Sequence, residues 1–251
     1  METACMTTVL VGGGPDTTRR RDCLQPFVEA CLQRDVSRVG LLLAGDADSA
    51  ELFAPEYTTL LPKLADRINI VALEDGIQSI SQFDAFVVGG GPTPAYHSAL
   101  RPVFADIRRM VASGCPYLGF SAGAMIAGDQ AVLGGYQTGG VDVCPADWSE
   151  GLNEITLRGG LGIVPGVIEV HAAQAGTLGR AIHIVLRQQA RIAVALDEDT
   201  ALHSSADRAT EVLGAGRAWW IHANELGQAV VDPVSAGQSV PDQVQRLQHG
   251  R

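Results

Sequence analysis

The chain has 251 residues, of which 46% are hydrophobic and 18% are charged; this composition supports a sizeable buried core and excludes compositional disorder. Its formal net charge of −10 opposes binding to the phosphate backbone of a nucleic acid. No apolar run approaches the roughly 18 residues of a membrane span, and residues 1–8 lack the segments of a secretory signal, so we expect a cytoplasmic protein without membrane partners.

The cysteine pattern concerns the redox environment and metal binding. Five cysteines are scattered along the chain, and none forms a CxxC pair. This usage favours free thiols in a reducing cytoplasm over a disulfide framework or a zinc site. We therefore expect neither a metal site nor a cofactor.

The first two-thirds of the chain alternates short apolar runs with longer amphipathic ones. Predicted strands cover residues 8–11, 39–44, 68–73, 85–88 and 116–120, and predicted helices cover residues 23–34, 49–66 (with breaks near Pro55 and Pro62) and 102–113. This alternation predicts a parallel sheet with helices on both faces. In such sheets ligands bind at the carboxyl ends of the strands, where two glycine runs, Gly12–Gly14 and Gly89–Gly91, and the turn at Ser121 are expected.

The pattern changes after Ala131. Residues 134–151 are rich in glycine and turn residues and include Tyr136 and Trp148, which is compatible with either a lid or a plain surface loop. The sequence then predicts strand–turn–strand over residues 161–171, a helix over 177–189, a buried strand over 192–196, and hairpin-like strands from Thr200. Without a repeat or linker, residues 1–251 are expected to form a single domain, with residues 1–6 and about 236–251 as peripheral tails.

The segment Gly119-Phe-Ser-Ala-Gly123 matches the GxSxG pattern of a nucleophile elbow. The serine of such an elbow lies in a sharp, strained turn, so the residues two positions away must be nearly free of side chain. The small, apolar segment Ala122–Ala127 is suited to begin a buried helix. Its first N–H groups would then favour an oxyanion next to Ser121. A structural turn built from small residues is the alternative.

A nucleophilic serine needs a base within hydrogen-bond distance, and the chain has six histidines. His97 is expected just inside a helix near the second glycine run, where it would be exposed, and two others, His203 and His222, are expected on C-terminal strands. His171 differs, because it follows the strand at 167–170 and so reaches the same edge of the sheet as Ser121. The orienting acid is expected within Asp197-Glu198-Asp199, which ends another buried strand. Strand alternation places Glu198 on the opposite face from Asp197 and Asp199, so one or two of the three point away from the site, and the choice among them stays open.

Four motifs, in this order, resemble the dipeptidase E and cyanophycinase family of serine peptidases. The motifs are Val87–Gly91, Gly119–Ala124, Gly160–Gly166 leading to His171, and Leu196–Leu202. The resemblance runs from about Val9 to about His203. It implies an α/β fold of three layers, with a mostly parallel central sheet of the flavodoxin-like, class I glutamine-amidotransferase-like kind. We expect a C-terminal β-hairpin extension in addition.

The resemblance also implies the residues of the site. Its Ser–His–acid triad corresponds to Ser121, His171 and Glu198, in a chain order that differs from that of ordinary α/β-hydrolases. The oxyanion hole corresponds to the N–H groups of Gly90, Gly91 and Ala122. The candidate substrate-binding residues are Thr93, Glu169 and Arg180.

The specificity pocket departs from the family pattern. Pro92 stands where dipeptidase E-like proteins have asparagine after the glycine run. Cyanophycinases carry Asp-Gln before the histidine and two arginines after it, and these positions are Glu169-Val170, Ala175 and Thr177 here. The loss of two guanidinium groups argues against cyanophycin cleavage. Arg180 is left either to hold a substrate carboxylate or to lie on a helix surface.

These observations predict a serine peptidase that cleaves amide bonds of small peptides through an acyl-enzyme, with a homodimer left open. A glutamine amidotransferase would need cysteine at position 121, and Cys115 lies on the strand side of the elbow. A catalytically lapsed member of the fold is the other alternative. It would bind a small molecule or a nucleotide, with Gly12–Gly14 around a phosphate, although the run lacks GxGxxG spacing.

Overall fold

The computed structural model describes residues 6–13, 21–74, 76–77, 79–205 and 210–241. Gly14, Cys5, His249 and most of the two predicted tails lie outside these residues. Within the described part of the chain, no helix has the length and apolarity needed to span a membrane.

The first sheet contains the predicted parallel strands. Five of its strands run parallel to one another, and two antiparallel strands extend one edge. In the described part of the chain the order across this sheet is β13 (Glu211–Gly214), β12 (Thr200–Ser205), β1 (Thr7–Val11), β5 (Tyr117–Phe120), β4 (Ala85–Val88), β2 (Val39–Leu43) and β3 (Ile68–Ala72). Strands β1, β2, β4 and β5 are buried along their whole length, as their continuous apolar sequences predict.

Successive residues of these strands enter two different cores. In β2, Leu41 and Leu43 pack into one buried cluster, while Leu42 packs into the other. Helices α1 (Gln25–Gln33) and α2 (Ala47–Leu60) cover the first face, and α3 (Thr93–Leu100) and α4 (Phe104–Ala112) cover the second. This arrangement confirms the predicted layered α/β architecture.

The predicted helix over 49–66 is two helices. Asp46 caps α2 by accepting a hydrogen bond from the N–H of Ser49, at 2.8 Å, and the helix continues through Pro55 to Leu60. A separate 3-10 helix, Pro62–Arg67, follows. The chain therefore breaks only at the second of the two prolines. In the described part of the chain, further 3-10 helices cover Arg21–Leu24, Arg101–Val103 and Ala146–Trp148.

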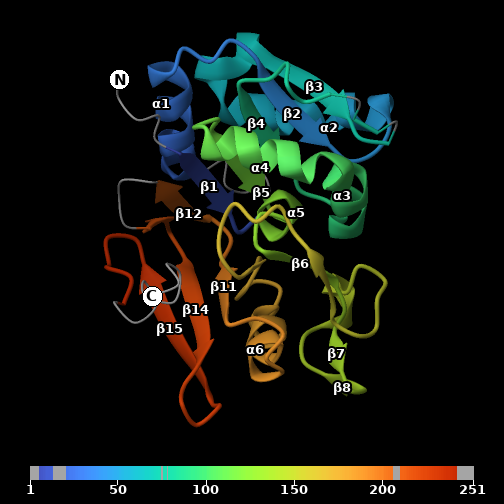
Figure 1. Ribbon diagram of the computed structural model, residues 1–251, viewed down its shortest axis with the longest axis vertical. Coiled ribbons are helices and arrows are strands. Elements are labelled where there is room, and N and C mark those ends of the chain that lie inside the picture. The colour runs from blue at the N-terminus through green and yellow to red at the C-terminus, as the bar shows by residue number, and fades with distance from the viewer. Residues whose placement is uncertain (1–5, 14–20, 75, 78, 206–209, 242–251) are drawn as a thin grey trace.

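The C-terminal half builds a second sheet, which the sequence did not predict as a separate unit. Its described strands are β15 (Ala229–Ser235), β14 (Arg217–Ala223), β11 (Ile192–Leu196), β10 (Val167–Glu169), β6 (Gln130–Gly134) and β9 (Thr156–Gly159). The predicted C-terminal hairpin is present as β14 and β15, but it forms the edge of this sheet. In Figure 1 these strands and α6 (Leu178–Leu186) occupy the lower part of the molecule.

The predicted strand–turn–strand over 161–171 is wrong in its first half. Residues 160–166 form a loop that follows the segment after the elbow, where Leu161 and Gly162 donate to the carbonyls of Ile126 and Gly128. Gly160 permits this contact, since a Cβ there would lie 2.3 Å from the Gly128 carbonyl oxygen. These backbone groups therefore pair with another loop rather than with a strand.

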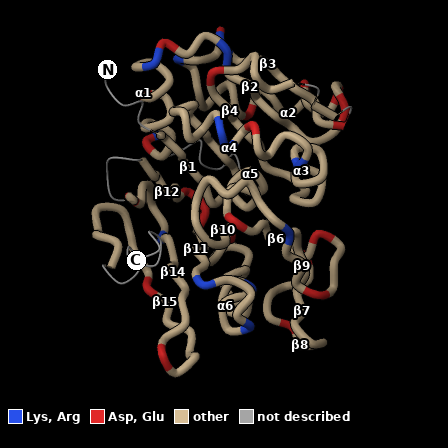
Figure 2. The backbone as a smooth tube through the Cα atoms, in the orientation of Figure 1, with Lys and Arg blue, Asp and Glu red and all other residues tan. Residues whose placement is uncertain are grey.

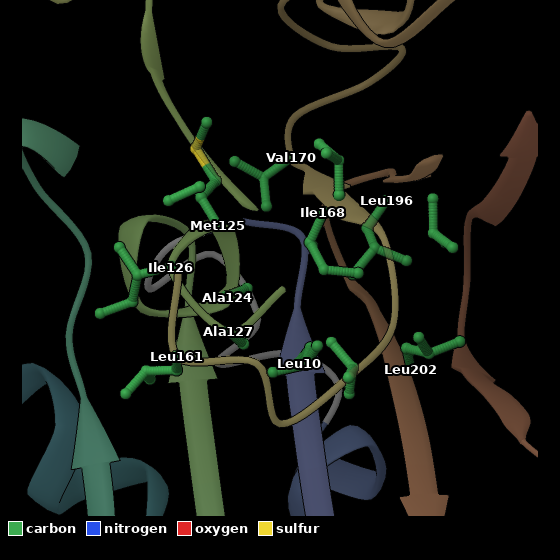
Figure 3. Close-up of a cluster of buried hydrophobic side chains, with 14 of the residues drawn as sticks. Leu10, Ala124, Met125, Ile126, Ala127, Leu161, Ile168, Val170, Leu196 and Leu202 are labelled. Atoms are coloured by element: carbon green, nitrogen blue, oxygen red, sulfur yellow. The ribbon is translucent and has the colours of Figure 1, made fainter. Parts of the chain in front are cut away.

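A continuous apolar cluster joins the elbow to the second sheet. The helix of the elbow, α5 (Ala122–Met125), begins at Ala122 as predicted and is only four residues long. Figure 3 shows Met125 beside Val170, and Ile168 beside Leu196, in this cluster. Packing between these side chains brings the carboxyl ends of β5, β10 and β11 to one place, which is the physical basis of the site described next.

Candidate active site

Ser121 lies in a strained turn between β5 and α5, with φ 44° and ψ −105°. The two glycines of the GxSxG segment permit this turn. A Cβ on Gly119 would lie 2.5 Å from the Gly123 carbonyl oxygen, and one on Gly123 would lie 2.3 Å from the Val88 carbonyl oxygen. The residue types of the elbow are therefore required by the close approach of three backbone segments.

The structure brings the three predicted triad side chains into one hydrogen-bonded chain. The Nε2 atom of His171 lies 2.9 Å from Oγ of Ser121, and its Nδ1 atom lies 2.7 Å from Oε1 of Glu198. His171 lies two residues after the end of β10 and Glu198 two residues after the end of β11, so both follow strands as predicted. Glu198 can only accept from Nδ1–H, so Nε2 is left to accept the Ser121 proton.

The other histidines and acids have different partners. His97 is buried and hydrogen-bonds the Gly159 carbonyl through Nε2, so its predicted exposure is wrong. Asp197 accepts three hydrogen bonds, from the N–H groups of Ala173 and Arg217 and from Nε1 of Trp219. Of the three acids left open by the sequence, only Glu198 is hydrogen-bonded to the imidazole.

The first glycine run packs closely against Asp197 and Glu198. A Cβ on Gly13 would lie 2.5 Å from Cγ of Glu198, and one on Gly12 would lie 2.3 Å from the Asp197 carbonyl oxygen. The Gly12 carbonyl also accepts a hydrogen bond from the His171 N–H at 2.7 Å. Close packing against the triad thus accounts for these two glycines without a nucleotide phosphate.

The predicted oxyanion hole needs one correction. The N–H of Gly90 donates to the hydroxyl of Tyr57 at 2.7 Å, while the carbonyl of Gly90 accepts from the hydroxyl of Tyr96 at 3.1 Å. Gly90 is therefore committed to the two tyrosines and is not a free donor. Among the described residues no acceptor takes the N–H of Gly91 or Ala122, which leaves these two beside Ser121.

Ser121 and His171 line a cavity of about 590 Å³, a size within the usual range of ligand-binding sites. Its walls are largely apolar and aromatic and include Leu43, Phe53, Tyr57, Met125, Trp148 and Val170. Thr93 also lines it, and its N–H and hydroxyl lie 3.2 and 3.5 Å from Oε1 of Glu150. The carboxylates on the cavity belong to Glu56, Asp147 and Glu150.

The side chain of Arg180 is buried, contrary to the helix-surface alternative. Its Nε and Nη2 atoms donate to the two carboxylate oxygens of Glu169, at 2.6 and 2.9 Å. Burial opposes its charge, but the Glu169 carboxylate outweighs this effect and keeps the pKa of Arg180 above its usual value. Glu169 is 0% exposed and does not line the cavity. It was predicted to bind substrate, but in the structure its carboxylate binds Arg180 instead.

Arg180 also fixes the segment 134–151, which carries Trp148. Its Nη1 atom donates to the carbonyl oxygens of Gly135 and Trp148, at 3.0 and 2.7 Å. The ring of Trp148 packs on that of His171, and both line the cavity. The segment includes β7 (Gln137–Thr138) and β8 (Val141–Asp142), and it forms a wall of the site, a contact that the sequence did not predict.

None of the described cysteines lines the cavity. Among the described residues, Cys31, Cys115 and Cys144 are free thiols. Cys115 precedes β5, at the opposite end of that strand from Ser121, and burial raises the pKa of its thiol to about 12. This position argues against an amidotransferase role for Cys115. Among the described residues, no group of three or more His, Cys, Asp and Glu side chains is arranged to hold a metal ion.

Comparisons with known proteins identify peptidases as the proteins that this chain resembles. The model of peptidase family S51 matches residues 64–212, more than half of the chain. The chain is similar in structure to a peptidase from an acI-B1 actinobacterium, with a TM-score of 0.66 and 16% identity over 95% of this chain and 98% of the other. A putative peptidase E from Listeria monocytogenes EGD-e matches with a TM-score of 0.52 and 16% identity, over 85% of this chain and all of the other. No curated protein sequence matches the chain.

Proposed function

The chain belongs to peptidase family S51 and is a serine-type peptidase, and we propose that it cleaves amide bonds of small peptides with Ser121, His171 and Glu198 as its triad. The observation that carries this proposal is the unbroken chain of two hydrogen bonds from Oγ of Ser121 to the carboxylate of Glu198. The cavity of about 590 Å³ next to these atoms supports a short peptide as the substrate.

In the first half of the proposed reaction, Oγ of Ser121 attacks the carbonyl carbon of the scissile amide while Nε2 of His171 takes the hydroxyl proton. The imidazolium that forms is stabilised by Glu198, which accepts from Nδ1–H. The tetrahedral oxyanion is held by the N–H groups of Gly91 and Ala122, at about 3–4 kcal/mol for each donor. His171 then protonates the departing amine, and the C–N bond breaks to leave an acyl-enzyme.

In the second half a water molecule replaces the amine. His171 removes its proton through Nε2, the resulting hydroxide attacks the ester carbonyl, and the proton returns to Oγ of Ser121 as the acid leaves. The fixed tautomer of His171 lets one nitrogen act in both steps. Water is a weak nucleophile, so this step depends on the same two N–H donors as the first.

The assignment is tested with a fluorophosphonate, which phosphonylates an activated serine. Wild-type protein should be labelled at Ser121 and should hydrolyse small peptides, while Ser121→Ala should lose both properties. Ser113→Ala is the matched control, because Ser113 lies at the end of α4 and hydrogen-bonds the carbonyl of Arg109. Undiminished labelling of Ser121→Ala would move the nucleophile to another residue.

A further inference from the structure

The charges on the cavity differ from those of a pocket for acidic peptides. Arg180 is the only lysine or arginine among the described residues that line the cavity, and its guanidinium is neutralised by the carboxylate of Glu169. On the part of the cavity wall that the structure describes, a substrate carboxylate would therefore meet no free cation. It would instead approach the carboxylates of Glu56, Asp147 and Glu150.

These three carboxylates come from two parts of the fold. Glu56 extends from α2, one turn after Phe53, which also lines the cavity. Asp147 and Glu150 flank Trp148 in the segment 134–151, and Figure 2 shows acidic residues in the part of the chain around β7 to β9. All three are exposed, so they form an acidic rim above the apolar walls of the cavity.

The orientation of this rim is fixed by contacts within the site. Oε1 of Glu150 accepts from Thr93, at the first turn of the helix that follows Gly91. The Trp148 carbonyl is held by Arg180, which positions the neighbouring Asp147 as well. Asp147 and Glu150 therefore belong to the segment whose Trp148 ring packs on His171, and Glu150 contacts the helix that follows the oxyanion donor Gly91.

We propose that the acidic rim selects peptides with a positively charged group, namely a lysine or arginine side chain or a free α-ammonium. The aliphatic stem of a basic side chain would contact Phe53 and Met125, and its cation would pair with the rim carboxylates. Cations also bind favourably over aromatic faces such as that of Trp148. This inference rests on the proposed function, because it assigns the specificity of that same cavity.

The size of the preference follows from the exposure of the rim. An exposed ion pair changes an equilibrium by a factor of about two to five, so three carboxylates together should favour a cationic peptide by about tenfold or more. Because the pairs are exposed, about 1 M salt should remove most of this preference. A peptide with glutamate in place of lysine should bind more weakly than a neutral one.

Binding to Ser121→Ala tests the proposal without hydrolysis. In the first arm, calorimetry compares a lysyl peptide with its norleucyl counterpart; a lower Kd for the lysyl peptide shows selection of the side chain. In the second arm, it compares a norleucyl peptide that has a free α-ammonium with the N-acetylated form; a lower Kd for the free peptide shows selection of the α-ammonium. At least one arm should show this difference. The combined change Glu56→Gln, Asp147→Asn and Glu150→Gln should abolish the difference. Glu51→Gln, on α2 but outside the cavity lining, is the matched control and should keep it.

The possible failures are distinguishable. Equal Kd values in both arms, tighter binding of the glutamyl peptide, or a preference that survives the triple change would overturn the acidic rim as the selector. The wild-type protein would still hydrolyse neutral peptides and be labelled at Ser121 if only this inference failed. Loss of labelling and hydrolysis in wild-type protein would instead count against the proposed triad.

Discussion

The indole ring of Trp148 packs against the imidazole ring of His171, with ring centroids 4.8 Å apart and an interplanar angle of 35°. Trp148 comes from the segment 134–151 and His171 from the end of β10, so two separate parts of the second half of the chain meet here. The indole covers one face of the imidazole. This contact limits both the rotation of the ring and the approach of water to it.

Replacement of Trp148 by alanine should lower kcat/KM by about three- to tenfold, because a packed aromatic pair contributes about 0.5–1.5 kcal/mol. Trp148→Phe should retain more activity than Trp148→Ala. Steady-state hydrolysis of one neutral peptide is the measurement, and Val141→Ala, an exposed residue of β8, is the control. Equal activity of Trp148→Ala and wild type would show that the indole does not position the imidazole.

Glu198 and Asp197 should respond differently to loss of their charge. Glu198→Gln should lower kcat by about 10³-fold or more, because the imidazolium loses its carboxylate partner. Asp197→Asn should mainly lower the free energy of unfolding, by about 1–3 kcal/mol, because this buried carboxylate accepts three hydrogen bonds. Kinetics and urea unfolding of both variants check this. A larger loss of kcat in Asp197→Asn than in Glu198→Gln would show that Asp197, and not Glu198, is the partner of the imidazolium.

Tyr57 accepts from the N–H of Gly90 and Tyr96 donates to its carbonyl, so the two tyrosines fix the peptide groups on both sides of Gly90 and place the N–H of Gly91. Tyr57→Phe leaves the Gly90 N–H without its acceptor, and we expect kcat to fall about tenfold with little change in KM, because the oxyanion forms only in the transition state. Tyr96→Phe should act in the same direction. Tyr136→Phe, a tyrosine outside this loop, should leave kcat unchanged, and an equal fall there would contradict this explanation.

The Arg180–Glu169 pair should make a large contribution to stability as long as one partner remains. Arg180→Met leaves the carboxylate of Glu169 buried without its cation and should lower the free energy of unfolding by about 3–5 kcal/mol. The double change Arg180→Met with Glu169→Leu should cost less than the single one, since no charge is then buried. Arg109→Met, which removes an exposed ion pair with Asp106, should cost about 0.5 kcal/mol or less. An additive double variant would disprove the coupling.

Two buried thiols should make stability fall at alkaline pH. Burial raises the pKa values of Cys31 and Cys115 to about 12, above the ordinary thiol value of 9.0. Between about pH 9 and 12 the unfolded chain therefore binds fewer protons than the folded one, and the free energy of unfolding decreases as pH rises. Urea unfolding at pH 8 and pH 10.5 measures this loss. Combined Cys31→Ala and Cys115→Ala should reduce the slope, and an unchanged slope would contradict it.

Local sequence patterns predicted the elements that position the site. The strand at 116–120, the turn at Ser121 and the strands before His171 and Glu198 are encoded by short apolar runs and small residues, because the backbone requires these types locally. Alternation of strands and helices predicted that these carboxyl ends share one edge of a single sheet, which is wrong, because β5 lies in the first sheet and β10 and β11 lie in the second. Packing of the two sheets brings the three strand ends together instead. The family resemblance, which the match to peptidase family S51 confirms, named one acid among three neighbours.

Tertiary contacts decided the features that single segments do not encode. The Gly90 N–H has the same local sequence whether it faces a substrate or the hydroxyl of Tyr57, 33 residues away. The local sequence around Arg180 is that of an ordinary helix. Only in the folded protein do Glu169 and the segment 134–151 enclose its side chain. Hydrogen bonds and ion pairs of this kind join residues far apart in the chain. The packing of α2 on the first sheet and of the second sheet on the elbow determines which donor, cation and carboxylate remain free for a substrate.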